Sequence, residues 1–273
     1  AAVVSNMTRG RSCSCLMAEK AETDVFPIDM GIACEVEHRG ELHPLTERKI
    51  RRGTSNFTKA AAMTRQEVLT AILTGIDAVR VLKEQGYRLS AVGEMGIGNT
   101  TTSSAVASVL LQKDPELVTG AGAGLDSAGL KRKTEAIRRG IGLHHPDPMD
   151  GMEVLQKVGG FDLAAMAGSF LGGAIYHVPV VIDGVIAAAA AAAARRIAPA
   201  ATDYMLAAHV SAEPASIWLL DLIGVTPAIQ AGLRLGEGTG ALALFPLLDM
   251  ALSIYRDMDT FAEMEIEEYK PLV

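Results

Sequence analysis

The stretch LSAVGEMGIGNTTT, residues 89–102, decides the fold class. A short apolar run is followed by three glycines within six residues and then by hydroxyl side chains. This strand–loop–helix pattern is typical of α/β proteins, in which glycines let the backbone approach a ligand and the next helix offers free N–H groups to phosphate. No Gly-Lys-Ser/Thr closes the loop as in a Walker A motif, and it matches a dinucleotide-binding fingerprint poorly. By pattern alone, a tight turn with a helix cap explains the stretch equally well.

The same alternation continues along the chain. Apolar runs at 179–183 and 204–209 predict further strands, and 24–31 predicts a buried strand that meets a loop. A basic helix should begin near Gly129, and an alanine-rich helix should follow residue 184. The alternation predicts an α/β fold, a parallel sheet with helices on both faces. Further helices are expected at 64–85, 100–111, 150–158, 161–176, 213–223 and 239–258. The first of these should begin with a capping box, because Glu67 follows the candidate N-cap Thr64 by three residues.

Composition narrows the classes of partner. The chain has 273 residues, 49% of them apolar, which suits one large core. A net charge of -7 argues against nucleic acid as the main partner. No signal peptide is visible, and the apolar run at 185–194 is too short to cross a membrane. Three cysteines indicate a reducing compartment such as the cytoplasm, and Cys13 and Cys15 are interpreted as buried thiols because no partner pair has metal-site spacing.

Two carboxylates lie in glycine-rich loops. Glu94 would repel a phosphate unless it faces a ribose hydroxyl or a base N–H, and the alternative is a solvent-facing side chain. Glu237 lies in LGEGTG, residues 235–240, where a carboxylate over an apolar site tends to have a raised pKa. Glu237 is therefore a candidate general base. The rival interpretation is a partner for the dipole of the helix that starts near Thr239.

Two further segments offer donors. Lys131, Arg132 and Lys133 follow a glycine-rich turn at 118–124 and could bind phosphate, although the pattern favours a solvated basic helix face. Ser211 lies in HVSAE, residues 209–213, without the Gly-x-Ser-x-Gly elbow of a nucleophile. We interpret Ser211 as a helix cap or a ligand donor.

The order of the motifs resembles one family. The motifs are NMTRG at 6–10, IDMGI at 28–32, GEMGIGNTT at 93–101, KVGGFD at 157–162, DG at 183–184, SAE at 211–213 and RLGEGTG at 234–240. Each motif is weak alone, but the ordered set is highly specific. The series is similar to nicotinate-nucleotide–dimethylbenzimidazole phosphoribosyltransferases of cobalamin lower-ligand synthesis, over nearly the whole chain.

The resemblance implies a Rossmann-like parallel sheet and a homodimer. It implies a single domain over residues 1–273, with the terminal helices contributing to a smaller helical part. The implied reaction transfers the phosphoribosyl group of nicotinate mononucleotide to 5,6-dimethylbenzimidazole or a related base, without cofactor or metal, giving alpha-ribazole 5'-phosphate and nicotinate. Glu237 matches the catalytic base and Glu94 a second active-site carboxylate. The implied substrate-binding residues are Met95, Gly96, Asn99, Thr100, Gly122, Lys133, Gly184, Ser211 and Leu235.

The chain departs from the family pattern in two places. Family members carry an upstream strand with an Asp-His-Gly loop and a Pro-Pro-Gly-Ser-Leu-Gly stretch, so an N-terminal segment with part of the base pocket is expected to be missing. The usual Ser-His before Ser-Ala-Glu reads Ala208-His209. Two alternatives therefore stay open: a non-catalytic nucleotide-binding module of the same fold, and a transferase that uses a purine or phenolic acceptor. The polar stretch at 32–57 has no predicted function.

Overall fold

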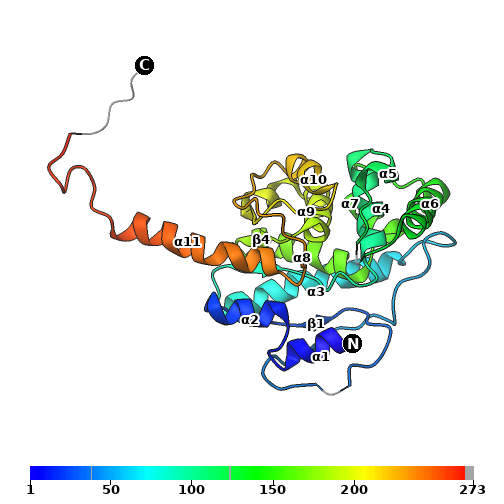
Figure 1. Cartoon of the computed structure of the whole chain (residues 1–273), viewed down its shortest axis with the longest axis horizontal. Helices are drawn as coiled ribbons and strands as arrows, with labels where there is room; N and C mark the ends of the chain where they lie inside the picture. Colours follow the sequence, from blue (N-terminus) through cyan, green and yellow to red (C-terminus); the bar gives the residue numbers. More distant parts are fainter. Residues whose placement is uncertain (38, 123, 268–273) are drawn as a thin grey trace.

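The computed structural model describes residues 1–37, 39–122 and 124–267 (Figure 1). Through the central part of the chain, helices and strands alternate as predicted from the sequence. In chain order, the elements are α1 (Ala2–Thr8), α2 (Cys13–Lys20), β1 (Ile28–Asp29), β2 (Thr46–Glu47), α3 (Arg65–Glu84), β3 (Ser90–Val92), α4 (Thr100–Leu111), α5 (Pro115–Val118), α6 (Ser127–His144), α7 (Gly151–Val158), α8 (Phe161–Tyr176), β4 (Val180–Ile182), α9 (Val185–Ile197), the 3-10 helix η1 (Pro199–Tyr204), β5 (Met205–Ala207), α10 (Ser216–Ile223) and α11 (Thr239–Asp257).

The central sheet consists of three parallel strands in the order β3-β4-β5. Val180 of the middle strand pairs with Ser90 on one side and with Met205 on the other. Because all three strands run the same way, their carboxyl ends meet at one edge, where open α/β sheets bind ligands.

Helices cover both faces of this sheet, as predicted. The strand β4 is fully buried, and its side chains alternate between two hydrophobic clusters. Val180 and Ile182 belong to the main core with α8 and α9. Val181 points the other way and packs with Ala241 and Leu244 of α11. The period of two along the strand therefore builds a three-layer arrangement around a very short sheet.

The helix α3 begins with the predicted capping box. The Thr64 hydroxyl accepts from the Glu67 N–H at 3.2 Å, and the Glu67 carboxylate accepts from the Thr64 N–H at 2.7 Å. Further along, α3 lies directly on α8, since a Cβ at Gly75 would lie only 1.9 Å from the Ala165 carbonyl oxygen. Backbone contact of this kind requires glycine, and the close packing fixes α3 against α8.

The strand predicted at 24–31 is much shorter in the structure. Only Ile28 and Asp29 form a strand, and they pair with β2 in a separate two-stranded sheet. Proline at position 27 shortens the ladder, because it has no N–H to donate. The polar stretch at 32–57 thus supplies β2 and is anchored by Arg51, which donates to Glu67 at 2.6 Å.

Two helices begin at residues other than those predicted from the sequence. The helix α10 begins at Ser216, three residues after the predicted start, because Pro214 disfavours helical geometry in the residue before it. The basic helix α6 begins at Ser127, where Asp126 caps the N–H of Gly129 at 2.7 Å. A side-chain cap therefore sets the start of α6, whereas α10 has no side-chain cap and its start follows from the proline.

Candidate active site

A cavity of about 190 Å³ lies beyond the carboxyl ends of β3, β4 and β5. The loops that follow these strands form its walls, which is the expected place for a ligand in this fold. Eight of the eleven predicted site residues line it: Glu94, Met95, Gly96, Thr100, Gly122, Gly184, Ser211 and Leu235. The other three are hydrogen-bonded to lining residues, namely Asn99 and Glu237 to Glu94 and Lys133 to Thr100.

Two helix starts meet at one end of this cavity. The helix α4 begins at Thr100 and α9 begins at Val185, directly after Gly184, and these three residues line the cavity. Neither helix has an acidic residue in its first turn. Their free N–H groups and the positive ends of their dipoles make this end suitable for phosphate.

Lys133 brings a cation to the same end. Its side chain is buried, and Nζ donates to the Thr100 hydroxyl and to the Gly120 carbonyl, both at 3.1 Å. Burial lowers the pKa of Lys133, and the nearby Glu213 carboxylate opposes this shift. Lys131 and Arg132 are exposed. The solvated-face interpretation is therefore correct for those two residues and wrong for Lys133, because the helical phase turns it inward.

The two glycine-rich loops touch one another through their backbones. A Cβ at Gly93 would lie 2.3 Å from the Gly238 nitrogen. The Glu237 N–H donates to the Glu94 carbonyl at 2.7 Å. The glycines are thus required for the close approach, which brings two distant carboxylates into one site.

Asp183, at the end of β4, is a site residue that sequence reasoning missed. Its Oδ1 accepts from the N–H groups of Gly240 at 2.7 Å and Ala241 at 3.1 Å, and its Oδ2 accepts from Gly238 at 3.2 Å. Asp183 therefore caps α11 and fixes the loop that carries Glu237. His209 lies 3.8 Å away and packs so closely on Gly240 that a Cβ there would overlap the ring.

Glu237 itself is held by the first part of the chain. Its backbone is left-handed, with φ +58°. Its Oε2 accepts from the Ser14 N–H at 3.2 Å and from the Ser14 hydroxyl at 3.3 Å. Ser14 belongs to the first turn of α2, so Glu237 is bound at the start of α2, while Asp183 takes the capping position of α11. The hydroxyl cluster of Ser12 and Ser14 was the only sequence signal for this contact.

Glu94 belongs to a network of two acids and one amide. Its Oε2 accepts from the Gly96 N–H and, at 2.6 Å, from Nδ2 of Asn99. The same Nδ2 donates to Oδ2 of Asp162 at 2.7 Å. Burial raises the pKa of Glu94 to about 7, and the charge of Asp162 adds to the rise. Burial also raises the pKa of Asp162. The site therefore contains a carboxyl group that changes its charge near neutral pH.

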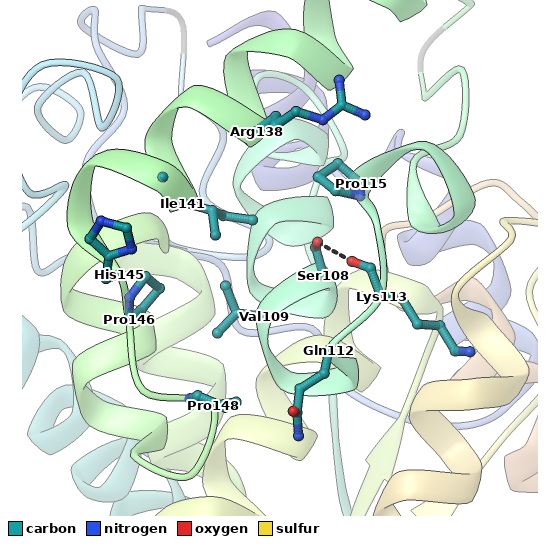
Figure 2. Close-up of a pocket in the computed structure, with 11 residues that line it drawn as sticks. Ser108, Val109, Gln112, Lys113, Pro115, Arg138, Ile141, His145, Pro146 and Pro148 are labelled. Carbon is teal, nitrogen blue, oxygen red and sulfur yellow. Dashed lines mark hydrogen bonds between the residues drawn. The ribbon is translucent and has the colours of Figure 1, made fainter.

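A larger hollow of about 440 Å³ lies elsewhere, between the end of α4, the start of α5 and α6 (Figure 2). Several of its polar groups already have protein partners. The Ser108 hydroxyl donates to the Lys113 carbonyl at 2.6 Å, and Arg138 pairs with Asp114 at 3.0 Å. The concentration of glycines, helix starts and acids distinguishes the smaller cavity as the candidate active site.

Known proteins match this chain over nearly its full length. A family model described as phosphoribosyltransferase matches residues 1–266. The nicotinate-nucleotide–dimethylbenzimidazole phosphoribosyltransferase of Clostridium acetobutylicum is 44% identical over 272 residues, which cover 100% of this chain and 76% of that protein. The chain belongs to this phosphoribosyltransferase family.

Other members of the phosphoribosyltransferase family give the same result. The relative from Ruminiclostridium cellulolyticum is 44% identical over 270 residues, covering 99% of this chain and 76% of its own length. The crystal structure of CobT from Thermus thermophilus superposes with a TM-score of 0.90 at 38% identity, covering 97% of this chain and 78% of that one. These findings confirm the family, the α/β fold class and the enzyme class predicted from the sequence.

The remaining sequence predictions concern membranes, metals and thiols. Within the described ranges, the helices are too short or too polar to cross a membrane. In the same part of the chain, His, Cys, Asp and Glu side chains do not gather in threes at metal-binding distances. Cys15 is buried as predicted, but Cys13 is exposed. The buried-thiol interpretation is therefore wrong for Cys13, because position 13 lies on the outer face of α2.

Proposed function

We propose that this chain transfers the phosphoribosyl group of nicotinate mononucleotide to 5,6-dimethylbenzimidazole or a related base, in cobalamin lower-ligand synthesis. The products would be alpha-ribazole 5'-phosphate and nicotinate. One observation carries the proposal: a single cavity combines two helix starts and a buried lysine, which suit an anion, with the Glu94 carboxylate and apolar side chains, and the loop of Glu237 is hydrogen-bonded to Glu94. The names of the relatives, which state this activity for those proteins, support it.

The phosphate of the nucleotide fits the end formed by α4 and α9. Lys133 supplies the cation, and Thr100 and Ser211 supply hydroxyl groups. Gly122 and Gly184 also line the cavity, where the absence of a side chain lets a ligand approach their backbones closely. Anchored there, the nucleotide would present its anomeric carbon to the loops of Glu94 and Glu237. Positioning of this kind contributes several kcal/mol to catalysis.

The reaction is a single displacement at the anomeric carbon. The bond to the pyridinium nitrogen of nicotinate breaks, and its electron pair neutralises that ring. One ring nitrogen of the incoming base forms the new bond from the opposite face, so a β-linked substrate gives an α-linked product. The proton on the other ring nitrogen passes to the Glu237 carboxylate. General base catalysis of this kind contributes about 10²–10⁴-fold to the rate.

The acceptor base fits the apolar side of the cavity. Met95 and Leu235 line it, and Leu235 is 64% exposed. A flat aromatic ring would cover such side chains and so remove apolar surface from water. The ring N–H would then lie towards the loop of Glu237, while Glu94 closes the cavity from the side.

A product assay tests the proposal. We expect the chain, incubated with nicotinate mononucleotide and 5,6-dimethylbenzimidazole, to yield nicotinate and a benzimidazole ribotide in equal amounts, measured by mass spectrometry. Parallel reactions with a purine and with a phenol rank the acceptors, and a larger rate with either would replace the benzimidazole in the proposal. Saturable nucleotide binding without any product would instead identify a non-catalytic module.

We also propose that two copies of the chain associate through α11. Figure 1 shows this helix projecting away from the body of the molecule. Leu247, Met250 and Ile254 lie on one side of it at helical spacing and are 43%, 56% and 61% exposed. An apolar stripe on a projecting helix is typical of a self-association surface.

We propose the cytoplasm as the place of action, because the three cysteines of the chain are free thiols.

Light scattering after size-exclusion chromatography measures this association. We expect twice the chain mass for the unmodified protein and the single chain mass for Ile254→Asp, because a buried charge in an apolar interface is costly. Arg256→Asp, on the opposite side of α11, should leave the mass doubled. A single chain mass for the unmodified protein, or a doubled mass for Ile254→Asp, would contradict the role of α11.

A further inference from the structure

Asn99 holds two acids that come from different parts of the chain. Glu94 lies in the loop after β3, and Asp162 lies in the first turn of α8. Nδ2 of Asn99 has two hydrogens and donates to both carboxyl groups, at 2.6 and 2.7 Å. Its Oδ1 is buried and has no partner among the described residues. The amide is therefore committed to the two acids and has no free donor for a ligand.

The second oxygen of Glu94 faces the other loop. A Cβ at Gly236 would lie 3.5 Å from Oε1 of Glu94, so this oxygen faces the loop that carries Glu237. Oε2 is already occupied by the Gly96 N–H and by Asn99. Only Oε1 can therefore act on a bound molecule, and it can donate a hydrogen bond only while it carries a proton.

Charge explains why such a group should carry a proton. The proposed nucleotide brings a phosphate and a nicotinate carboxylate into the cavity, and an ionised Glu94 would repel both in a poorly hydrated site. Asp162 lies one amide away and opposes a second negative charge on Glu94. The other acids that face Glu94 are Asp183, which three backbone N–H groups of α11 bind, and Glu237, which Ser14 binds.

We propose that Asp162 and Asn99 are positioning residues that set the protonation of Glu94 while the anionic nucleotide binds. The negative charge of Asp162 resists ionisation of Glu94 and keeps it protonated, whereas Asn99 fixes the carboxyl group in place and partly offsets Asp162 by favouring the charged form. Neither residue touches the substrate in this arrangement. The inference rests on the proposed function, because it assigns a role to Glu94 within that same site.

Two substitutions should move the ionisation of Glu94 in opposite directions. Asp162→Asn removes a negative charge, so Glu94 should ionise at lower pH. Asn99→Ala removes a donor that favours the charged form, so Glu94 should ionise at higher pH. A purely structural role would not produce opposite signs. Asn99 makes no side-chain cap bond to α4, so its replacement should spare that helix.

Carbon NMR reads this ionisation directly. The protein would carry ¹³C in its glutamate side-chain carboxyl groups, and the Glu94 signal is the one that Glu94→Gln removes. We expect a midpoint of about 7 in the unmodified protein, a midpoint lower by about one pH unit in Asp162→Asn, and a higher one in Asn99→Ala. Asp150→Asn, which removes a charge at the start of α7, should leave the midpoint unchanged. Shifts in the same direction, or none, would overturn the proposal.

Kinetics provide the second measurement. The KM for nicotinate mononucleotide should rise as pH passes through the Glu94 midpoint, and in Asp162→Asn this rise should begin at lower pH. Circular dichroism checks that each variant is folded. If the chain transfers no phosphoribosyl group, the proposed function fails while the NMR titration still decides the network. If transfer occurs and the midpoints do not move, the network fails and the function stands.

Discussion

Glu237→Gln is expected to lower kcat by about 10²–10⁴-fold, the usual contribution of a general base, while nucleotide affinity stays nearly unchanged. A glutamine amide cannot take the proton from the incoming base. It keeps the size of the side chain, and its oxygen can still accept from Ser14, so the loop should keep its shape. Steady-state rates with 5,6-dimethylbenzimidazole give kcat, and calorimetry gives the Kd for nicotinate mononucleotide.

Glu84→Gln is the matched control, since Glu84 is exposed on α3, pairs with Arg80 on the surface and does not line the cavity. It should keep full activity. Full turnover in Glu237→Gln would remove Glu237 from the role of base. A large loss of nucleotide affinity would instead show that the substitution disturbs the contact between the two glycine loops.

The sequence was sufficient for the elements that local signals define. The capping box at Thr64 gave the start of α3, and the period of the apolar residues gave α8 at its true limits. The glycine loops were placed correctly because several glycines between a strand and a helix are typical of a loop. Ordered motifs then supplied the family, which the comparisons confirm.

Contacts between distant residues could not be read in the same way. Ser14 and Glu237 are 223 positions apart, and the hydroxyl groups near Ser14 do not indicate which carboxylate they bind. Asp183 caps a helix that begins at Thr239, although caps are normally sought beside the helix itself. Only the family resemblance singled out Lys133 from the exposed basic residues beside it, because composition does not show which side of a helix faces inward.

Lys133→Met is expected to raise the KM for nicotinate mononucleotide by about 30- to 5,000-fold, because truncating a buried charged partner typically costs about 2–5 kcal/mol. Methionine fills similar space but cannot bind phosphate, the Thr100 hydroxyl or the Gly120 carbonyl. Lys131→Met, on the exposed side of α6, should leave KM unchanged. The binding of inorganic phosphate, measured by calorimetry, should weaken in Lys133→Met alone.

The two substitutions should divide the cavity by function. If Lys133 binds the phosphate equally in the ground and transition states, its loss raises KM and leaves kcat almost unchanged. If Glu237 acts only when the proton moves, its loss lowers kcat and leaves binding intact. An equal KM in Lys133→Met and Lys131→Met would contradict the phosphate site. A fall in kcat for Lys133→Met as deep as that for Glu237→Gln would mean that the phosphate anchor also aligns the anomeric carbon, so that the two ends act as one unit.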